Sequence, residues 1–134
     1  MTEFPLKIVT PDGLCFDGPA EELIVRSSTG DVAILAKHVN YVTSLGMGQA
    51  VIVSKGQRRT AACIGGILSV VDGHVTLLPS TFEWSDQIDV ARADASYRRA
   101  DAVLHDKNAS ETDLKLAEAR LRRALIRKSV ASSK

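Results

Sequence analysis

The sequence predicts an α+β protein, in which an antiparallel β-sandwich is followed by an antiparallel two-helix hairpin. All glycines and prolines of the 134 residues lie at or before Pro79. These residues mark turns between short strands. Residues 80–134 contain neither and are rich in Ala, Arg and Leu, so they can run as uninterrupted helix. We therefore expect residues 1–84 to form the sandwich and residues 85–134 to form the hairpin.

The strands are expected where β-branched and other apolar residues lie between turn signals. Turns at intervals of about 8–12 residues are typical of an antiparallel sandwich or barrel. The segment has room for about eight to ten short strands, arranged as two sheets packed over Val, Ile and Leu. The expected strands are residues 6–10, 14–16, 22–27, 32–35, 41–45, 50–54, 59–64, 67–71 and 75–78. The expected turns include residues 11–13, 17–19, 46–48, 55–57 and 72–74.

The first helix of the hairpin is expected to run from about Gln87 to His105. Asp86 precedes it as a candidate N-cap, and Asp89 lies in the first turn, where a carboxylate faces the positive helix end. At about 100° per residue, one helix face collects small apolar residues and two arginines. These residues are Ile88, Ala91, Ala95 and Ala102, with Arg92 and Arg99.

The second helix is expected to run from Ser110 to about Ser129, after a polar break at residues 106–109. Asp113 completes a capping box with Ser110, and residues 131–134 are expected to fray. Its apolar stripe holds Leu114, Ala117, Leu121, Ala124 and Leu125, and its basic face holds Arg120, Arg123 and Arg127. Alanines bury little area. We therefore expect a weakly held hairpin that can open or re-dock through a link at residues 80–82.

Composition and motifs argue against several classes of protein. With 45% hydrophobic and 25% charged residues, the chain resembles an ordinary soluble protein, and no run approaches the ~20 apolar residues of a membrane span. No signal-peptide pattern is expected at its start. Cys15 and Cys63 form no CxxC and are expected to be reduced thiols. His38 and His74 lack the partners of a metal or catalytic site, so we expect neither metal binding nor catalysis.

Positive charge gathers in the helical segment. Arg is always charged, and its planar side chain matches phosphate oxygens in a bidentate manner. Arginines from both helices could converge on one polyanion when the hairpin closes, and Asp89 could orient Arg92 or accept a hydrogen bond from adenine or ribose. From spacing alone, solvated arginines and weak intrahelical ion pairs are the simpler interpretation.

Several segments resemble the epsilon subunits of bacterial F-type ATP synthases. Residues 29–35 (TGDVAIL), His38 and residues 43–45 are similar to the family's G-[ED]-x-x-I-L…H…T-x-L stretch. Residues 65–78 contain its G-G-h-h-x-V and V-x-h-h patterns, where h is hydrophobic. Residues 88–93 (IDVARA) fit the I/L-D-x-x-R-A motif by which some members bind ATP. The resemblance covers essentially the full length and includes the order of the two parts.

The resemblance implies a non-catalytic rotor subunit, peripheral at the cytoplasmic face of the bacterial cell membrane. Its partners would be the gamma subunit, the ring of c subunits and the catalytic alpha/beta hexamer, whose ATP hydrolysis the extended hairpin inhibits. By analogy, Asp31 faces the ring, His38 lies near surfaces shared with gamma, and Arg120 meets acidic beta-subunit segments. The family often has prolines around the histidine, whereas residues 36 and 39–40 here are not proline.

The resemblance also implies that ATP, as a regulatory ligand, holds the hairpin folded on the sandwich. The matching positions are Glu83, Ile88, Asp89, Arg92, Ala93, Arg99, Arg123 and Arg127, the last two aligned across a one-residue difference in the inter-helix turn. Two other interpretations stay open on the residues alone. One is a nucleic-acid-binding module that uses the basic helix, although Tyr97 is the only aromatic residue of the hairpin. The other is a small β-barrel enzyme with a helical tail.

Overall fold

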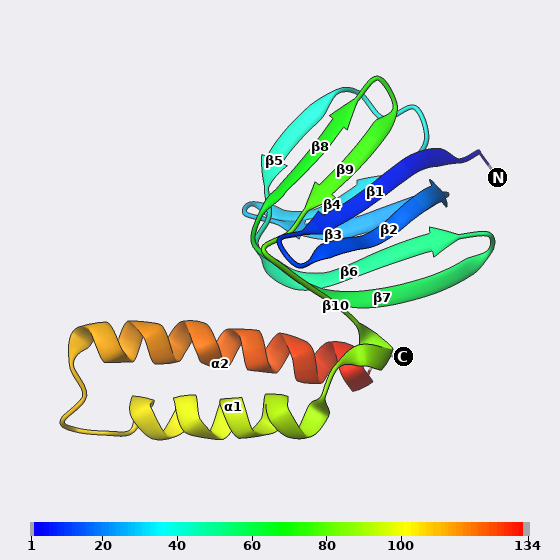
Figure 1. Ribbon diagram of the computed structural model, residues 1–134. Coiled ribbons are helices and arrows are strands. Elements are labelled where there is room, and N and C mark those ends of the chain that lie inside the picture. The colour runs from blue at the N-terminus through cyan, green and yellow to red at the C-terminus, as the bar shows by residue number, and fades with distance from the viewer. Residues whose placement is uncertain (1, 133–134) are drawn as a thin grey trace.

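The computed structural model describes residues 2–132 as two packed five-stranded sheets followed by two helices (Figure 1). This confirms the predicted sandwich and hairpin. The ten strands in that range are β1 (Phe4–Thr10), β2 (Gly13–Ala20), β3 (Glu22–Ser27), β4 (Gly30–Ile34), β5 (Tyr41–Ser44), β6 (Met47–Ser54), β7 (Gln57–Ile64), β8 (Ile67–Val71), β9 (His74–Leu78) and β10 (Thr81–Trp84). A 3-10 turn, Ser85–Gln87, then leads to α1 (Val90–Leu104) and α2 (Glu111–Ser132).

The sheets have the strand orders β2-β1-β9-β8-β5 and β10-β7-β6-β3-β4. Every strand pairing of the described residues is antiparallel except that of β1 with β9, where Leu6 lies opposite Val75. The local hydrophobic pattern predicts strands but not which distant strand returns beside β1, so this parallel pair is not visible in the sequence. The two sheets enclose side chains such as Ile8, Ile52 and Leu77, all with 0% exposure.

Two of the expected turns lie inside strands. β2 continues through Gly18 and Pro19 because it pairs with β1 along this length, and as an edge strand it tolerates a proline. β6 begins at Met47, so Gly48 is also a strand residue. A Cβ at Gly48 would lie 2.6 Å from the Cβ of Arg26, which explains a glycine within a strand by close approach of a neighbour.

The two cysteines are free thiols, as expected. Cys63 is 3% exposed in the sandwich core, and Cys15 packs against the same core from β2. Burial raises the pKa of Cys63 to about 12, with a smaller contribution from Cys15. The thiol of Cys63 is therefore protonated at neutral pH and is a poor nucleophile.

The first helix begins later than predicted. Asp86 lies in the 3-10 turn and is not the N-cap; the N-cap is Asp89, whose Oδ1 accepts a hydrogen bond from the backbone N of Arg92 at 3.0 Å. The cause is Ile88, which is extended (φ −74°, ψ 126°) and 8% exposed, because its side chain packs against the sandwich. This anchor delays the helix until Val90.

The second helix has the predicted start and a later end. Ser110 and Asp113 form the expected capping box: Ser110 Oγ accepts from the backbone N of Asp113 at 3.0 Å, and Asp113 Oδ2 accepts from that of Ser110 at 3.3 Å. The expected fraying of residues 131–132 is wrong, because Val130 and Ala131 are buried at 1% and 8% exposure. Residues 133–134 lie outside the described residues.

The two helices pack through small residues, but on a different face of α1 from the one predicted. The buried alanines along the helices are Ala93, Ala100, Ala117 and Ala124, in addition to Ala131 at the end of α2. Ala91 and Ala102, expected in the seam, are exposed. The prediction included Ile88 in the first helix. Because Ile88 lies before α1, the direction of its side chain does not show which face of α1 is buried. Leu125, expected in the apolar stripe of α2, is 45% exposed.

An apolar cluster anchors the C-terminal end of the hairpin to the sandwich. Ala62 of β7, Ile88, Val130 and Ala131 form a small apolar cluster, separate from the sandwich core, against which Ile126 also packs. The last turn of α2 thereby returns to the junction where β10 passes into α1 (Figure 1). The expected link at residues 80–82 is largely strand, since Thr81 and Phe82 pair with β7, and the connection between the two parts is the short segment that follows Trp84.

Candidate nucleotide-binding clefts

Two adjoining clefts open along the hairpin. The first, of about 690 Å³, lies between the helices and is lined by Ser96, Arg99, Arg120, Arg123 and Arg127, among others. The second, of about 490 Å³, lies where the start of α1 meets β10 and the turn between β1 and β2. Its lining includes Asp12, Glu83, Asp89, Arg92 and Ala93. Ser96 and Arg127 line both clefts, so the two volumes meet at these side chains.

Seven of the eight residues predicted to bind ATP line these clefts. Glu83, Asp89, Arg92 and Ala93 line the second, Arg99 and Arg123 line the first, and Arg127 lines both. Ile88 lies apart, in the apolar cluster that anchors the hairpin. Folding therefore brings together side chains from β10, α1 and α2 that are far apart in the sequence.

Arg127 and Glu83 form an ion pair across the second cleft. Arg127 Nε donates to Glu83 Oε1 at 2.6 Å, with the two side chains 27% and 33% exposed. This contact ties α2 directly to β10. Asp89 has a structural role as well, because one of its carboxylate oxygens caps α1 at the backbone of Arg92. The suggestion that Asp89 orients the Arg92 side chain is not supported by a recorded contact.

A second ion pair crosses between the helices. Lys128 Nζ lies 3.0 Å from Asp94 Oδ1 and 4.8 Å from the ring centroid of Tyr97. The hydrogen bond from Lys128 is the main cause that lowers the pKa of Asp94, and the charge of Arg98 acts in the same direction. The sequence offers no signal for this contact, since the partners are 34 residues apart.

We expect the substitution Lys128→Met to raise the pKa of Asp94 toward the ordinary value of about 3.9. Because the pKa of Asp94 is lowered in the folded protein, this ion pair stabilises the closed hairpin at pH values above the ordinary pKa of the carboxyl group. That contribution is lost as the pH falls through the lowered value, and it weakens with added salt. An NMR titration of the Asp94 carboxyl group measures the shift. Lys115→Met, on the exposed side of α2, is the matched control, and an equal pKa in both variants would contradict the assignment.

The residues predicted to contact partner subunits lie in different places. Asp31 Oδ1 accepts from Arg26 Nε at 2.6 Å on the β3–β4 hairpin, and this contact raises the pKa of Arg26. His38 lies in the loop before β5, where its ring is 5.9 Å from that of Tyr41. Residues 36–40 contain no proline, and Asn40 Oδ1 accepts a hydrogen bond from the backbone N of Asp72 at 2.8 Å, which fastens the loop to the β8–β9 turn.

The sequence analysis did not predict several polar residues that line the clefts, including Asp106, Asn108 and Asp113 near the inter-helix turn. Asp12 approaches from the turn between β1 and β2, and Ser96 lies where the two clefts meet. Arg120, expected to contact a partner subunit, lines the first cleft. Only Arg120 had a detectable signal, because it shares a helix face with Arg123 and Arg127. None of the described residues forms a His, Cys, Asp or Glu group suited to a metal ion, and no helix among them has the length and apolar character to span a membrane.

Comparisons with known proteins agree on one family. Residues 3–85 match the family model described as "ATP synthase, Delta/Epsilon chain, beta-sandwich domain", and residues 86–132 match the "long alpha-helix domain" of the same chain. The ATP synthase epsilon chain of Ruminococcus albus is 44% identical over 135 residues and covers 100% of both chains. The epsilon chain of Caldanaerobacter subterraneus subsp. tengcongensis is 38% identical and covers 96% of this chain and 94% of its own.

Solved structures show the same fold at low sequence identity. A chain of the Euglena gracilis mitochondrial ATP synthase (OSCP/F1/c-ring) superposes with a TM-score of 0.84 at 19% identity, covering 96% of this chain and 81% of that one. A chain from the central stalk and c-ring of the Tetrahymena thermophila mitochondrial ATP synthase gives a TM-score of 0.62 at 14% identity, with 97% of each covered.

Proposed function

The chain belongs to the delta/epsilon chain family of the ATP synthases, and from this membership we propose that it acts as a rotor subunit in the central stalk of a bacterial proton-translocating F-type ATP synthase. It is a non-catalytic subunit of that enzyme. We propose that its sandwich joins the gamma subunit to the ring of c subunits, at the cytoplasmic face of the cell membrane. Full-length matches to bacterial epsilon chains support this placement.

The regulatory part of the proposal concerns the hairpin. We propose that the extended hairpin inhibits ATP hydrolysis by the alpha/beta hexamer and that ATP stabilises the closed hairpin. The observation that carries this proposal is the assembly of arginines from both helices along one continuous pair of clefts. These arginines face a common volume only when the helices lie side by side. A polyanion that binds them therefore favours the closed state, because a ligand shifts an equilibrium by its difference in affinity.

The distribution of charged side chains along the clefts favours one orientation of a bound nucleotide. Three carboxylates, those of Asp12, Glu83 and Asp89, line the cleft near β10 together with Arg92. The cleft between the helices is lined by Arg99, Arg120 and Arg123, and by Asp106 and Asp113 at its far end near the inter-helix turn. Carboxylates accept hydrogen bonds from amino and hydroxyl groups and repel phosphates, while arginines pair with phosphates. We therefore place the nucleoside near β10 and the phosphates between the helices.

The energies are of a suitable size for a switch. Changing a ratio of closed to open hairpins from 1:99 to 99:1 takes about 5.5 kcal/mol of differential binding. Hydrogen bonds to charged groups contribute about 1.5–3 kcal/mol each, so a few arginine–phosphate contacts suffice. The alanine seam between the helices buries little apolar area and does not fix the closed state by itself.

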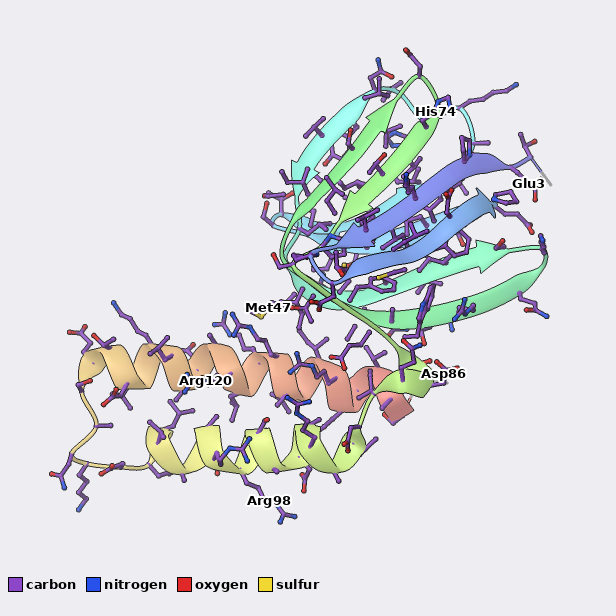
Figure 2. All side chains as sticks on the ribbon, viewed as in Figure 1. Glu3, Met47, His74, Asp86, Arg98 and Arg120 are labelled. Carbon is purple, nitrogen blue, oxygen red and sulfur yellow. The ribbon has the colours of Figure 1, made fainter. Side chains whose placement is uncertain are left out.

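We expect ATP to bind the purified chain and to protect the amides of α1 and α2 from hydrogen exchange, with the sandwich unchanged. Arg123→Gln should weaken ATP binding about tenfold, the cost of one charge-assisted contact. Calorimetric titration measures the affinity. Arg98→Gln is the control, because Arg98 projects from α1 away from α2 (Figure 2) and its side chain is 79% exposed. Equal protection of the helices with and without ATP would refute the regulatory role and leave the family membership intact.

A further inference from the structure

Arg120 lines the cleft between the helices, beyond the arginines that match the family's ATP-binding positions. On α2, Arg122 pairs with Glu118 at 3.0 Å and Arg127 pairs with Glu83, whereas the cleft-lining Arg120 and Arg123 pair with no carboxylate of the described residues. Among residues 2–132, no ion pair or hydrogen bond engages the Arg120 guanidinium group. Arg120 is therefore an uncommitted cation at the edge of a volume that other arginines already line.

The antiparallel helices arrange the cleft residues in successive levels. Ser96 and Arg127 line both clefts and mark the first level, and Arg99 and Arg123 follow. Arg120 lies one level further from β10. Because an α-helix rises about 1.5 Å per residue, Arg120 is displaced about 10 Å along the axis from Arg127. Each phosphate added to a nucleoside held near β10 carries negative charge further toward Arg120.

We propose that Arg120 binds the terminal phosphate of a nucleoside triphosphate and thereby sets a preference for the triphosphate over the diphosphate. This inference rests on the proposed ATP site and on the nucleoside lying near β10. With a diphosphate, the negative charge ends at the level of Arg99 and Arg123, and Arg120 stays in water. With a triphosphate, the planar guanidinium group meets two phosphate oxygens at once.

A pair of variants on one helix tests this role. Arg120→Gln and Arg122→Gln remove the same charge, but Arg122 lines a different cleft, between α2 and the sandwich, beside Arg26 and Met47. Figure 2 shows Met47 on the side of the sandwich that faces α2. The affinities of the full-length chain and of both variants for ATP and for ADP are measured by calorimetry. Both arginines are exposed, so both variants should fold, which circular dichroism checks.

We expect Arg120→Gln to weaken ATP binding about tenfold and to change ADP binding by less than about twofold. Arg122→Gln should leave both affinities close to those of the original chain. Equal weakening of ATP and ADP by Arg120→Gln would overturn the proposal, since it would indicate a general electrostatic effect, and so would unchanged ATP affinity. Absence of ATP binding by the original chain would instead refute the proposed site itself, which separates the two failures.

Discussion

The substitution Val130→Asp is expected to release the hairpin from the sandwich while the sandwich stays folded. Val130 is 1% exposed in the cluster with Ala62 and Ile88, which is the apolar anchor of the hairpin. Burying a carboxylate among such groups costs several kcal/mol. The partly exposed ion pair of Arg127 with Glu83, which joins α2 to β10, offsets little of this cost, since such pairs are typically worth about 0–1 kcal/mol. The end of α2 should therefore detach.

Hydrogen exchange resolved by residue measures this release. The amides of α1 and α2 should lose protection, whereas those of the sandwich strands should keep it, because the sandwich has a separate core. Leu125→Asp is the matched control: it makes a comparable apolar-to-acidic change on the same helix, at a side chain that is 45% exposed. A chain truncated after Trp84 provides the reference for the sandwich alone. Protection of the helices in the Val130→Asp variant equal to that in the control would contradict the anchor.

The second large effect is expected for Gly66→Ala, which should destabilise the sandwich itself. Gly66 lies between β7 and β8, where the chain passes from one sheet to the other, and has φ +99°. A Cβ at this position would collide with the carbonyl oxygen of Leu78 and lie 2.6 Å from Pro79 Cα. Both neighbours are backbone atoms and cannot rotate away. Backbone strain of about 1–3 kcal/mol therefore adds to the collision, and we expect a total loss above about 4 kcal/mol.

Gly73→Ala separates strain from collision. Gly73, in the β8–β9 turn, also has a positive φ of 80°, but a Cβ there would meet nothing within 4 Å. The Gly73→Ala substitution should lower the free energy of unfolding by only about 1–2 kcal/mol, which is the cost of an alanine in the left-handed conformation. Urea unfolding of both variants gives the two free energies of unfolding. Similar losses of stability in the Gly66→Ala and Gly73→Ala variants would contradict this prediction. They would show that Leu78 and Pro79 move aside and that the connection between β7 and β8 tolerates a side chain.

Local signals in the sequence predicted most of the helices and strands. Contacts between residues far apart in the sequence determine where some of them begin and end. The absence of Gly and Pro after Pro79 predicted the two helices but not β10, which also lies in that stretch. The Ser110–Asp113 capping box predicted where α2 begins. Ile88 shows the opposite case, because packing against the sandwich keeps it extended and moves the start of α1 to Val90. The same local reading could not show that β1 lies parallel to β9.

The candidate site could also be predicted only in part. Spacing on a helix predicted that Arg123 and Arg127 share a face, and the family resemblance related them to Arg92 and Arg99. The partner of each charge depended on tertiary structure: Glu83 is 44 residues from Arg127 in the sequence. Asp12 is further still from the helices, and nothing in its turn indicates that it lines a cleft. Helical periodicity can group side chains on one element, but it does not show which element they face.

The short junction after Trp84 has a mechanical consequence. Trp84 is 6% exposed, packs edge-on against Phe82 and carries Arg59 at 3.6 Å over its ring, so it forms a rigid pivot. α1 has 15 residues and α2 has 22, which correspond to lengths of about 22 Å and 33 Å. If the two helices were laid end to end from this pivot, with the turn at residues 105–110 straightened as well, the end of α2 would lie about 55 Å away. Changes confined to the backbone torsions of two short segments, residues 85–89 and 105–110, would thus move the end of α2 across a distance greater than the length of either helix alone.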